Sequence, residues 1–423
     1  MSAALGSTSV VVRRTVMTIA RPLSLALLPL LAGCAAIPDQ RPSAAAPLAQ
    51  VGVAFGRDAE VGSFAEGLAD PQTGRRITAD DPVRVASITK LAVAVGVMRL
   101  VEQGRLNLDG DVSATLGWRL RNPAFPHRPI SLRMLLSHTS SVRDGIAYWE
   151  IGVGDSIQGT MTEPKAWAED HPPGGYFTYS NLNFPIVASL VERVTGERFD
   201  RWMRAQVLEP MKLDACMNWL GCSQTAIARA VVLMQDGKAV RDDLGGKPPA
   251  CPAVPADDGS CDLTRWRAGE NGALFSPQGG LRISARGLAR IGRMLLGAGT
   301  LDGVRILSPQ SVESLLAPLW RFDRRNGQTD GGFYCSYGMA THWTATPGVT
   351  DCRDNPAGDG IARVGHAGEA YGLLSGLWID RARGTGVAYY VTGLAENPPP
   401  GRSAYRAAEE AALRRTLKLL VVR

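Results

Sequence analysis

Charged residues are scarce in this chain of 423 residues, and this scarcity narrows the possible partners. Asp, Glu, Lys and Arg together make up 20% of the sequence. Basic residues outnumber acidic ones by 46 to 40, but the two kinds alternate along the chain and form no basic stripe. Proteins that bind nucleic acids show such a clustered basic footprint. We therefore expect no nucleic-acid partner.

Several sequence motifs of common hydrolases and metal sites are also missing. There is no Gly-x-Ser-x-Gly, the motif that presents the nucleophile in α/β-hydrolases. There is no His-Glu-x-x-His and no Cys-x-x-Cys, and the 5 histidines are dispersed along the chain. These absences argue against a metallohydrolase, and we expect no metal ion.

No apolar run is long enough to span a bilayer as a permanent helix. The longest N-terminal run, 23–31, follows Arg13, Arg14 and Arg21 and ends just before Ala32-Gly33-Cys34. This pattern predicts an export signal. Its end resembles the bacterial lipobox, in which the cysteine is acylated. We expect a signal peptide over 1–34, lipidation at Cys34, and a location on the periplasmic side of the cell envelope; an ordinary signal peptide is the alternative.

The remaining cysteines support an oxidising compartment. Removing Cys34 from the 7 cysteines leaves an even number, spaced as close pairs: Cys216/Cys222, Cys251/Cys261 and Cys335/Cys352. Such spacing in an exported chain predicts disulfides, although six cysteines allow about 15 connectivities. Pairing by proximity is the prediction, and each short loop adds about 2–3 kcal/mol of stability on the chain-entropy model.

The order of predicted elements suggests a fold class. A tether over 35–48 precedes two strands near 51–55 and 62–69, and three more strands are predicted near 361–364, 373–380 and 386–392. Helices are predicted between these groups and over 402–420, and 216–271 is predicted to be an irregular, stapled insertion. The fold class is therefore α/β (α+β): an antiparallel sheet built from N- and C-terminal parts, flanked by helices, with a mostly helical region inserted. We divide the folded domain, 49–423, into a sheet part (49–86 and 272–423) and a helical part (87–271).

The clearest chemical motif is Ser87-Ile-Thr-Lys90, the only Ser-x-x-Lys in the chain. Three residues are just under one helical turn, so the hydroxyl and the amine share one face of a helix. The positive end of the helix dipole favours negative charge that develops on a serine at the helix start. A lysine in a dry pocket can lose its proton near neutral pH and then take the proton of the serine. A surface lysine beside an N-cap serine is the alternative.

Two further motifs contain groups suited to acyl chemistry. Tyr179-Ser-Asn181 offers a phenol that could relay a proton and an amide that could hold a substrate carbonyl. His366-Ala-Gly368 lies at the end of a predicted strand, where the glycine allows close approach of substrate and the amide of Glu369 can point into the site. A tyrosine or histidine that only packs in the core is the alternative for either.

Together, these motifs in this order resemble the serine β-lactamase and penicillin-binding superfamily, in particular its class C-like branch. That branch includes class C β-lactamases, D-Ala-D-Ala carboxypeptidases, D-aminopeptidases and family VIII esterases. The likeness extends from about Val51 to Leu420 and includes the stretches 130–140, 191–196 and 279–285.

The resemblance implies a role for each motif residue. Ser87 would be the nucleophile, Lys90 its base or the partner of its base, and Tyr179 the proton relay. Asn181 would orient the substrate, and His366 would occupy the place of the lysine in the family's Lys-Thr-Gly. Gly368 would allow the substrate to approach closely, and the amides of Ser87 and Glu369 would form the oxyanion hole. Because all these groups belong to the protein, we expect no cofactor.

Two departures from the family pattern bear on the substrate. His366 replaces a permanently charged lysine and Ala367 replaces a hydroxyl residue, so recognition of a substrate carboxylate should be weaker. We therefore expect a monomeric serine hydrolase that cleaves ester or amide bonds of small acyl or peptide substrates. The alternatives are a D-Ala-D-Ala carboxypeptidase, a β-lactamase, or a non-catalytic binding scaffold. We expect His138 to be structural, and the only membrane contact to be the N-terminal lipid.

Overall fold

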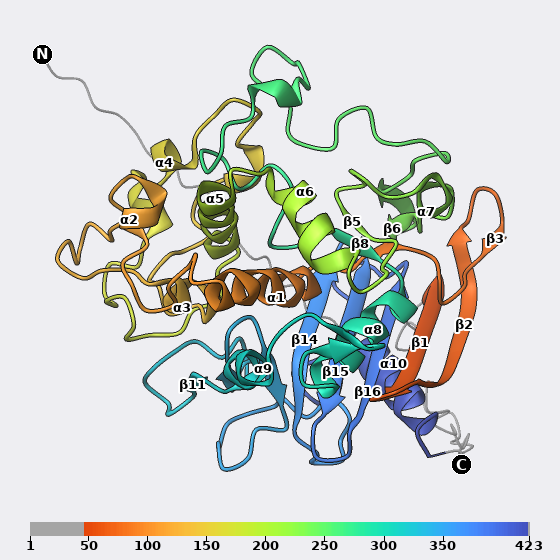
Figure 1. Ribbon diagram of the computed structural model, residues 1–423. Helices are drawn as coiled ribbons and strands as arrows, with labels where there is room; N and C mark the ends of the chain where they lie inside the picture. Colours follow the sequence, from red (N-terminus) through yellow and green to blue (C-terminus); the bar gives the residue numbers. More distant parts are fainter. Residues whose placement is uncertain (1–45, 422–423) are drawn as a thin grey trace, which may run out of the picture. The chain divides into compact units, whose positions relative to one another are not determined.

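Nine strands form one antiparallel sheet that draws on both ends of the chain. The computed structural model describes residues 46–421, so Cys34, the predicted signal peptide and most of the predicted tether lie outside the described residues. The order of strands is β11-β12-β13-β14-β15-β16-β1-β2-β3, which places β1 beside β16 (Figure 1). The predicted sheet of N- and C-terminal parts is thus confirmed.

The strands of this sheet are β1 Ala49–Gly56, β2 Glu60–Asp70, β3 Arg75–Arg76, β11 Trp320–Arg321, β12 Ser336–Tyr337, β13 His342–Thr344, β14 Arg363–Ala370, β15 Leu373–Asp380 and β16 Thr385–Thr392. A small three-stranded sheet contains β4 Val83–Arg84, β8 Leu281–Ile283 and β5 Cys216–Met217. Two hairpins complete the strands: β6 Leu233–Gln235 with β7 Lys238–Arg241, and β9 Thr300–Leu301 with β10 Val304–Arg305.

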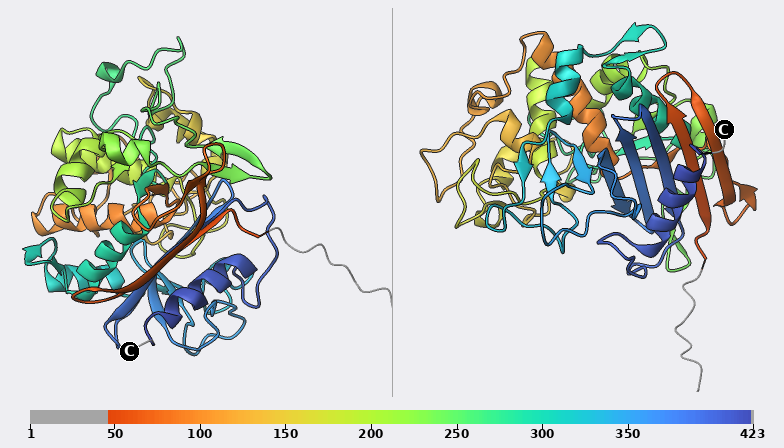
Figure 2. Two further views of the ribbon diagram at one scale, coloured as in Figure 1. Left: turned by 90° about the vertical axis from the view of Figure 1, so that its right-hand side faces the viewer. Right: turned by 90° about the horizontal axis from the view of Figure 1, so that it is seen from below.

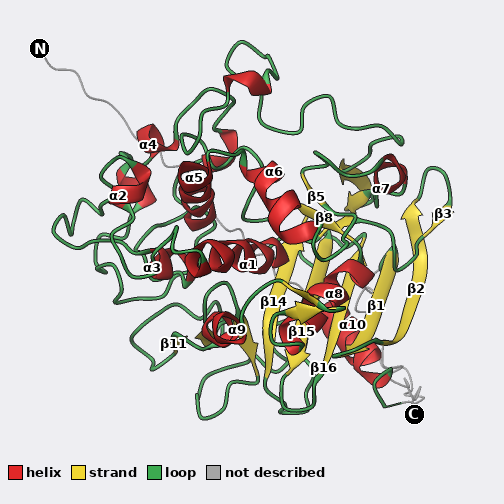
Figure 3. Ribbon diagram, in the orientation of Figure 1, coloured by secondary structure: helices red, strands yellow, loops and turns green. Residues whose placement is uncertain are grey.

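The helices are α1 Ile88–Glu102, α2 Ser113–Leu116, α3 Leu132–Leu136, α4 Ile157–Thr160, α5 Asn183–Thr195, α6 Phe199–Met203, α7 Gln224–Ala228, α8 Ala285–Leu296, α9 Pro309–Leu316 and α10 Ala407–Lys418. Most of the helices between α1 and α6 gather beside the sheet, whereas α8 and α10 cover it (Figure 3).

Both faces of the large sheet are buried, because helices pack against each of them. In β1, Val51, Val53 and Phe55 join the core on the α8 side, whereas Ala54 packs with Leu413 of α10 and its neighbours. Successive side chains of a strand point to opposite faces, so a strand covered on both sides is apolar almost throughout. Figure 2 shows α10 on one side of the sheet and α8 on the other.

The sequence placed some element boundaries correctly and others incorrectly. The prediction for β15, 373–380, was correct. The prediction that His366-Ala-Gly368 lies at a strand end was wrong, because β14 pairs with β15 through these residues as far as Ala370. The last helix begins at Ala407 rather than near 402. The preceding segment instead turns back on the helix, with Ser403 donating from its amide (2.7 Å) and its hydroxyl (2.6 Å) to Glu410 Oε1.

Three disulfides join Cys216 to Cys222, Cys251 to Cys261 and Cys335 to Cys352. The pairing by proximity is therefore confirmed. Two of them staple the insertion, and the third closes the loop between β12 and β14. Within 46–421, none of the helices combines the length and the apolar character that crossing a membrane requires.

Candidate active site

Ser87 occupies the position immediately before α1. The preceding residue, Ala86, adopts a positive φ of 48°, which is uncommon for a residue with a side chain and costs free energy. This turn ends β4 and starts the helix, so the serine lies at the positive end of the helix dipole. Strain of this kind is frequently found where a reactive group must be held in position.

Lys90 is fully buried and lies one turn along the same helix. Its Nζ is 3.0 Å from Ser87 Oγ, 2.8 Å from Asn181 Oδ1 and 2.8 Å from the carbonyl oxygen of Gln278. An ammonium group has three hydrogens, so these three acceptors use its whole donor capacity. A neutral amine would keep two of these bonds and could accept the proton of Ser87 through its lone pair.

Burial lowers the pKa of Lys90 from its usual value to about 7, and the negative charge of Asp144 only partly offsets this effect. Desolvation disfavours the charged form of a lysine, which is the physical reason for the shift. At neutral pH a large fraction of the amine is therefore unprotonated. A base with a pKa near the working pH is the kind that general base catalysis favours.

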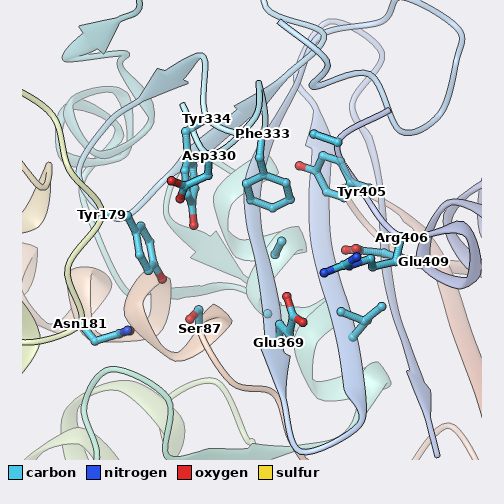
Figure 4. Close-up of a pocket in the computed structure, with 14 residues that line it drawn as sticks. Ser87, Tyr179, Asn181, Asp330, Phe333, Tyr334, Glu369, Tyr405, Arg406 and Glu409 are labelled. Carbon is cyan, nitrogen blue, oxygen red and sulfur yellow. The ribbon is translucent and has the colours of Figure 1, made fainter. Parts of the chain in front are cut away.

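Tyr179 comes from the loop before α5, and its ring lies 4.9 Å from Lys90 Nζ. Its hydroxyl is buried beside Ser87 but has no hydrogen-bond partner among residues 46–421 (Figure 4). Burial raises the pKa of Tyr179 above its usual value, and the nearby hydroxyls of Ser87 and Tyr334 offset this only in part. The phenol therefore keeps its proton at neutral pH and has it available for donation.

Asn181 is positioned by Asp144, a residue that the sequence analysis missed. Asp144 Oδ2 accepts from the amide (2.8 Å) and the Nδ2 (3.0 Å) of Asn181. Its other oxygen accepts from Ser180 Oγ and from the amide of Leu182, both at 2.8 Å. These bonds turn Asn181 Oδ1 towards Lys90. No motif distinguishes Asp144 in the sequence, because its role depends on the loop after α3 folding against the loop before α5.

The backbone of β14 lies directly against the nucleophile. A Cβ atom at Gly368 would lie 2.3 Å from the carbonyl oxygen of Val85 and 3.2 Å from the amide nitrogen of Ser87, so only glycine fits. Ser375 Oγ, on the neighbouring strand, lies 3.1 Å from the Val85 carbonyl and 3.3 Å from the Gly368 carbonyl. This close contact places Gly368, the residue before Glu369, against the backbone of Val85 and Ser87.

His366 lies behind this site rather than in its lining. Its ring is only 1% exposed, its Nε2 is 2.8 Å from the hydroxyl of Tyr337, and its Nδ1 is 2.5 Å from the carbonyl oxygen of Ala367. The Tyr337 hydroxyl also lies 3.2 Å from His138 Nε2. Both ring nitrogens of His366 are thus engaged within the protein. Burial, together with the charge on Lys90, lowers the pKa of both histidines well below the usual value.

The backbone groups at the two ends of this hydrogen-bonded series, the amide of Ser180 and the carbonyl of Ala367, set the direction of each bond. The amide of Ser180 donates to His138 Nδ1 (3.1 Å), so the proton of a neutral His138 lies on Nε2 and is donated to Tyr337. The Ala367 carbonyl can only accept, so His366 carries its proton on Nδ1 and accepts from Tyr337 at Nε2. We call this chain of three side chains, His138, Tyr337 and His366, the histidine–tyrosine chain.

A cavity of about 450 Å³ opens in front of Ser87. Figure 4 shows Tyr179 and Ser87 with their hydroxyls turned towards each other, and Glu369, Arg406 and Glu409 on the other side of the cavity. Tyr334, stacked on Tyr179 at 5.0 Å between ring centres, and Asp330 complete the wall near the phenol. Asp330 and Tyr334 come from the loop between β11 and β12, just before the third disulfide, and no local motif identified them.

One group of potential metal ligands is found within 46–421, namely Cys335, Cys352 and Asp354. The two sulfur atoms are bonded to each other, so they are not available as thiolate ligands.

The cavity in front of Ser87 contains protein groups suited to acyl transfer: a hydroxyl beside a base, a protonated phenol and backbone amides.

Comparison with known proteins gives a consistent result. The chain is 27% identical over 338 residues to penicillin-binding protein 4 of Amycolatopsis lactamdurans, covering 79% of this chain and 78% of that protein. It is 27% identical over 352 residues to esterase EstB of Burkholderia gladioli, covering 76% and 80%. The D-amino acid amidase of Ochrobactrum anthropi SV3 has the same fold, with a TM-score of 0.62 and 17% identity over 89% of this chain and 94% of the amidase.

The family model described as Beta-lactamase matches residues 38–412. This range contains β1 to β16 and the three motifs that begin at Ser87, Tyr179 and His366. The antiparallel sheet with its inserted helical region is the β-lactamase/transpeptidase fold. The chain therefore belongs to the Beta-lactamase family.

Proposed function

We propose that this protein is a serine hydrolase that forms an acyl-enzyme on Ser87 and hydrolyses ester or amide bonds of small acyl substrates. The observation that carries the proposal is the buried amine of Lys90, 3.0 Å from Ser87 Oγ and with its pKa lowered to about 7. A lysine that served only for packing or solubility would not be buried with its full donor capacity directed at a serine and two neighbouring oxygens.

The first half of the reaction follows from this geometry. Neutral Lys90 takes the proton of Ser87 as Oγ attacks the carbonyl carbon of the substrate. The carbonyl oxygen becomes an oxyanion, which the amides of Ser87 and Glu369 stabilise, each worth about 2.7–4 kcal/mol of the barrier. The bond to the leaving group then breaks, and Tyr179 donates its proton to the departing oxygen or nitrogen.

The second half returns the enzyme to its starting state. The phenolate of Tyr179 recovers a proton from the lysine ammonium, while Ser87 Oγ is held in the ester of the acyl-enzyme. A water molecule then attacks the acyl carbon and loses a proton to the same pair of groups. The acid leaves, and the proton goes back to Ser87 Oγ.

A carboxypeptidase is the second candidate, because of Arg406. This arginine lines the cavity in front of Ser87, across from Tyr179 (Figure 4), and a leaving group that takes the proton of Tyr179 would occupy this cavity. A guanidinium there could pair with the C-terminal carboxylate of a peptide, a role that the uncharged His366 does not fill. Glu369 and Glu409 line the same wall and would oppose a carboxylate, so ester or amide hydrolysis remains the first choice.

A fluorophosphonate probe tests the nucleophile directly. We expect it to label the wild-type protein and not the Ser87→Ala variant, whose thermal melting temperature serves as the folding control. Parallel assays with 4-nitrophenyl esters, a D-Ala-D-Ala peptide and nitrocefin then rank the substrates. Labelling that persists in Ser87→Ala would overturn the proposal, and nitrocefin as the best substrate would replace the esterase by a β-lactamase.

The proposal includes export and anchoring. The disulfides are consistent with an extracytoplasmic location, which would place the enzyme with other envelope hydrolases. We propose acylation at Cys34 and anchoring by that lipid alone, with the folded part active as a monomer. Metabolic labelling with a fatty-acid analogue should mark the wild type and spare Cys34→Ser, and equal labelling of both would contradict it.

A further inference from the structure

A second cavity, of about 380 Å³, lies between the stapled insertion and the residues around Ser87. Its lining includes Arg84 of β4, Arg282 of β8 and Arg241 of β7, together with Tyr371, which follows β14. We call these four residues the arginine pocket. No motif of the sequence pointed to it, because its three arginines are far apart in the chain.

Three arginines and two carboxylates line this pocket, so its positive charge is not fully neutralised. Arg282 donates to Asp242 Oδ1 at 2.9 Å, and both side chains are buried. Arg241 donates to the hydroxyl of Tyr371 at 3.0 Å and has no ion pair within 46–421. The guanidinium of Arg84 has neither a hydrogen bond nor an ion pair to any described residue, and Asp243, the other carboxylate of the lining, is exposed.

This arrangement is unfavourable for the arginines in the absence of an anion. Burial lowers the pKa of Arg84 to about 9, and repulsion from Arg282 and Arg241 adds to the effect. The ring of Tyr371 lies 5.2 Å from the guanidinium carbon of Arg84 and 4.7 Å from that of Arg241, which supplies an aromatic face but no charged acceptor. Three buried polar atoms of the lining have no partner among residues 46–421: the donor Arg282 Nε and the acceptors Asp242 Oδ2 and Gln278 Oε1.

The arginine pocket is connected to the catalytic residues at three points. Arg84 stands three residues before Ser87 in the chain. Gln278, which also lines the pocket, accepts from Lys90 Nζ through its carbonyl oxygen. Tyr371 follows Glu369 by two residues and takes a left-handed φ of 53° at the turn after β14. The pocket is therefore built in part from the segments that carry the nucleophile and the strand proposed to hold the oxyanion.

The position of Tyr179 decides which part of a substrate would enter the arginine pocket. Tyr179 lies in the cavity in front of Ser87, so a leaving group that takes its proton must occupy that cavity (Figure 4). The acyl group extends from the carbonyl carbon in a different direction. Two further cavities lie near the end of β14 and both include Tyr371: the arginine pocket, and one of about 230 Å³ that contains Glu369 and Glu396 but no basic residue. Of the two, only the arginine pocket offers positive charge to an acyl group.

We propose that the arginine pocket binds a carboxylate at the far end of the acyl chain, so that the preferred substrates are esters or amides of dicarboxylic acids. This proposal rests on the proposed acyl-enzyme at Ser87, and it names the class of ester or amide that supplies the acyl group. The carboxylate would pair with Arg84 and Arg241. Arginine is well suited to this because its planar guanidinium binds a carboxylate through two parallel hydrogen bonds.

A matched pair of esters tests the proposal. Mono-4-nitrophenyl adipate has a terminal carboxylate, and 4-nitrophenyl hexanoate has the same chain length without it. We expect wild-type kcat/KM to be at least about tenfold higher for the adipate, the effect of one charge-assisted hydrogen bond. The preference should fall as salt is added, because salt screens partly exposed charges.

The variant Arg84→Gln should bring the ratio of kcat/KM for the adipate and hexanoate esters close to one. It should fold normally, because the guanidinium that it removes has no hydrogen bond or ion pair to the described residues and lies against the ring of Tyr371 at 5.2 Å. Arg325→Gln, which removes an exposed arginine of another loop, is the control for net charge and should keep the preference. Should Arg84→Gln melt at a much lower temperature, Arg241→Gln, an exposed position, takes its place in the same comparison.

The possible failures can be told apart. Equal kcat/KM for the two esters in the wild type, or an undiminished preference in folded Arg84→Gln and Arg241→Gln, would overturn the arginine pocket and leave the acyl-enzyme intact. Turnover of neither ester, with no probe labelling of Ser87, would overturn the proposed function itself. Free adipate should inhibit hydrolysis of the hexanoate ester in the wild type more strongly than in Arg84→Gln.

Discussion

Two groups of polar side chains lie on either side of the proposed nucleophile, and they differ in how fully their hydrogen bonds are used. In the histidine–tyrosine chain, every ring nitrogen and the Tyr337 hydroxyl has a partner. Around Ser87, the Tyr179 hydroxyl has none within 46–421, and Lys90 binds three oxygens while its pKa is lowered to about 7. Similar residue types thus form a closed structural network in one place and a group ready to transfer protons in the other.

The difference indicates where reactivity resides. A buried polar atom with satisfied bonds stabilises the fold, and removing its partner costs free energy. A buried polar atom without a protein partner costs stability unless water or a ligand satisfies it, and the Tyr179 hydroxyl is one such atom beside the proposed nucleophile. Substitutions around Ser87 should therefore lower activity more than stability, and substitutions in the histidine–tyrosine chain should lower stability more than activity.

The largest loss of activity is expected from Lys90→Met, which removes the base and keeps the length of the side chain. We expect kcat/KM on a 4-nitrophenyl ester to fall by about 10²–10⁴-fold, the contribution typical of a general base. Lys165→Met, at an exposed lysine of another loop, is the matched control and should retain full activity. A Lys90→Met enzyme with more than a tenth of wild-type activity would show that the serine is activated in another way.

Tyr179→Phe is expected to separate activity from stability. Loss of the proton donor should lower kcat by about 10²-fold or more. The free energy of unfolding should change by less than about 1 kcal/mol, because the hydroxyl that is removed has no partner to leave unpaired. Urea denaturation measures the second quantity, and a large loss of stability would mean that the phenol has a structural bond.

Tyr337→Phe should give the reverse result. It leaves His138 Nε2–H and His366 Nε2 without their partner, which should cost about 1–3 kcal/mol of unfolding free energy. Activity of the folded variant should remain within about tenfold of the wild type, because Tyr337 does not line the cavity in front of Ser87. Steady-state kinetics below the melting temperature test this, and a loss comparable to that of Tyr179→Phe would remove the distinction between the two groups.

The pH dependence should reflect Lys90 and not the histidines. The neutral amine is the active form, so kcat/KM should be present above a pKa of about 7 and fall about tenfold per unit as the pH drops below it. The pKa values of His138 and His366 lie well below the usual value, so they stay neutral across this range. His366→Gln should therefore keep the same acidic limb, and a shift of that limb would assign it to the histidine.

Much of the fold was predictable because its signals are local. The apolar runs of β15, β16 and α1 reflect burial on all sides, and the regular spacing in α8 reflects burial of one face, which a sequence shows directly. The contact of Ser87 with Lys90 is equally local, because one helical turn enforces it. The start of the last helix was misjudged, since the hydrogen bonds of Ser403 to Glu410 depend on a turn that no periodicity reveals.

Other parts of the site depend on contacts between distant segments. Asp144 reaches Asn181 across two loops, and Tyr337 meets His366 through pairing of β12, β13 and β14. The place of His366, behind the site and with both nitrogens bonded, follows from that pairing. A sequence pattern shows which residues are suited to catalysis, but not which of them face the substrate.

The position of β1 between β2 and β16 has a consequence for how the molecule acquires activity. Its partner strand lies more than 300 residues later, so this pairing closes a very long loop, and folds dominated by such distant contacts form slowly. The strand that lies against Ser87 belongs to the same late segment. The site proposed around Ser87 therefore stays incomplete until the last strands have joined the sheet, so hydrolysis should begin only when folding is finished.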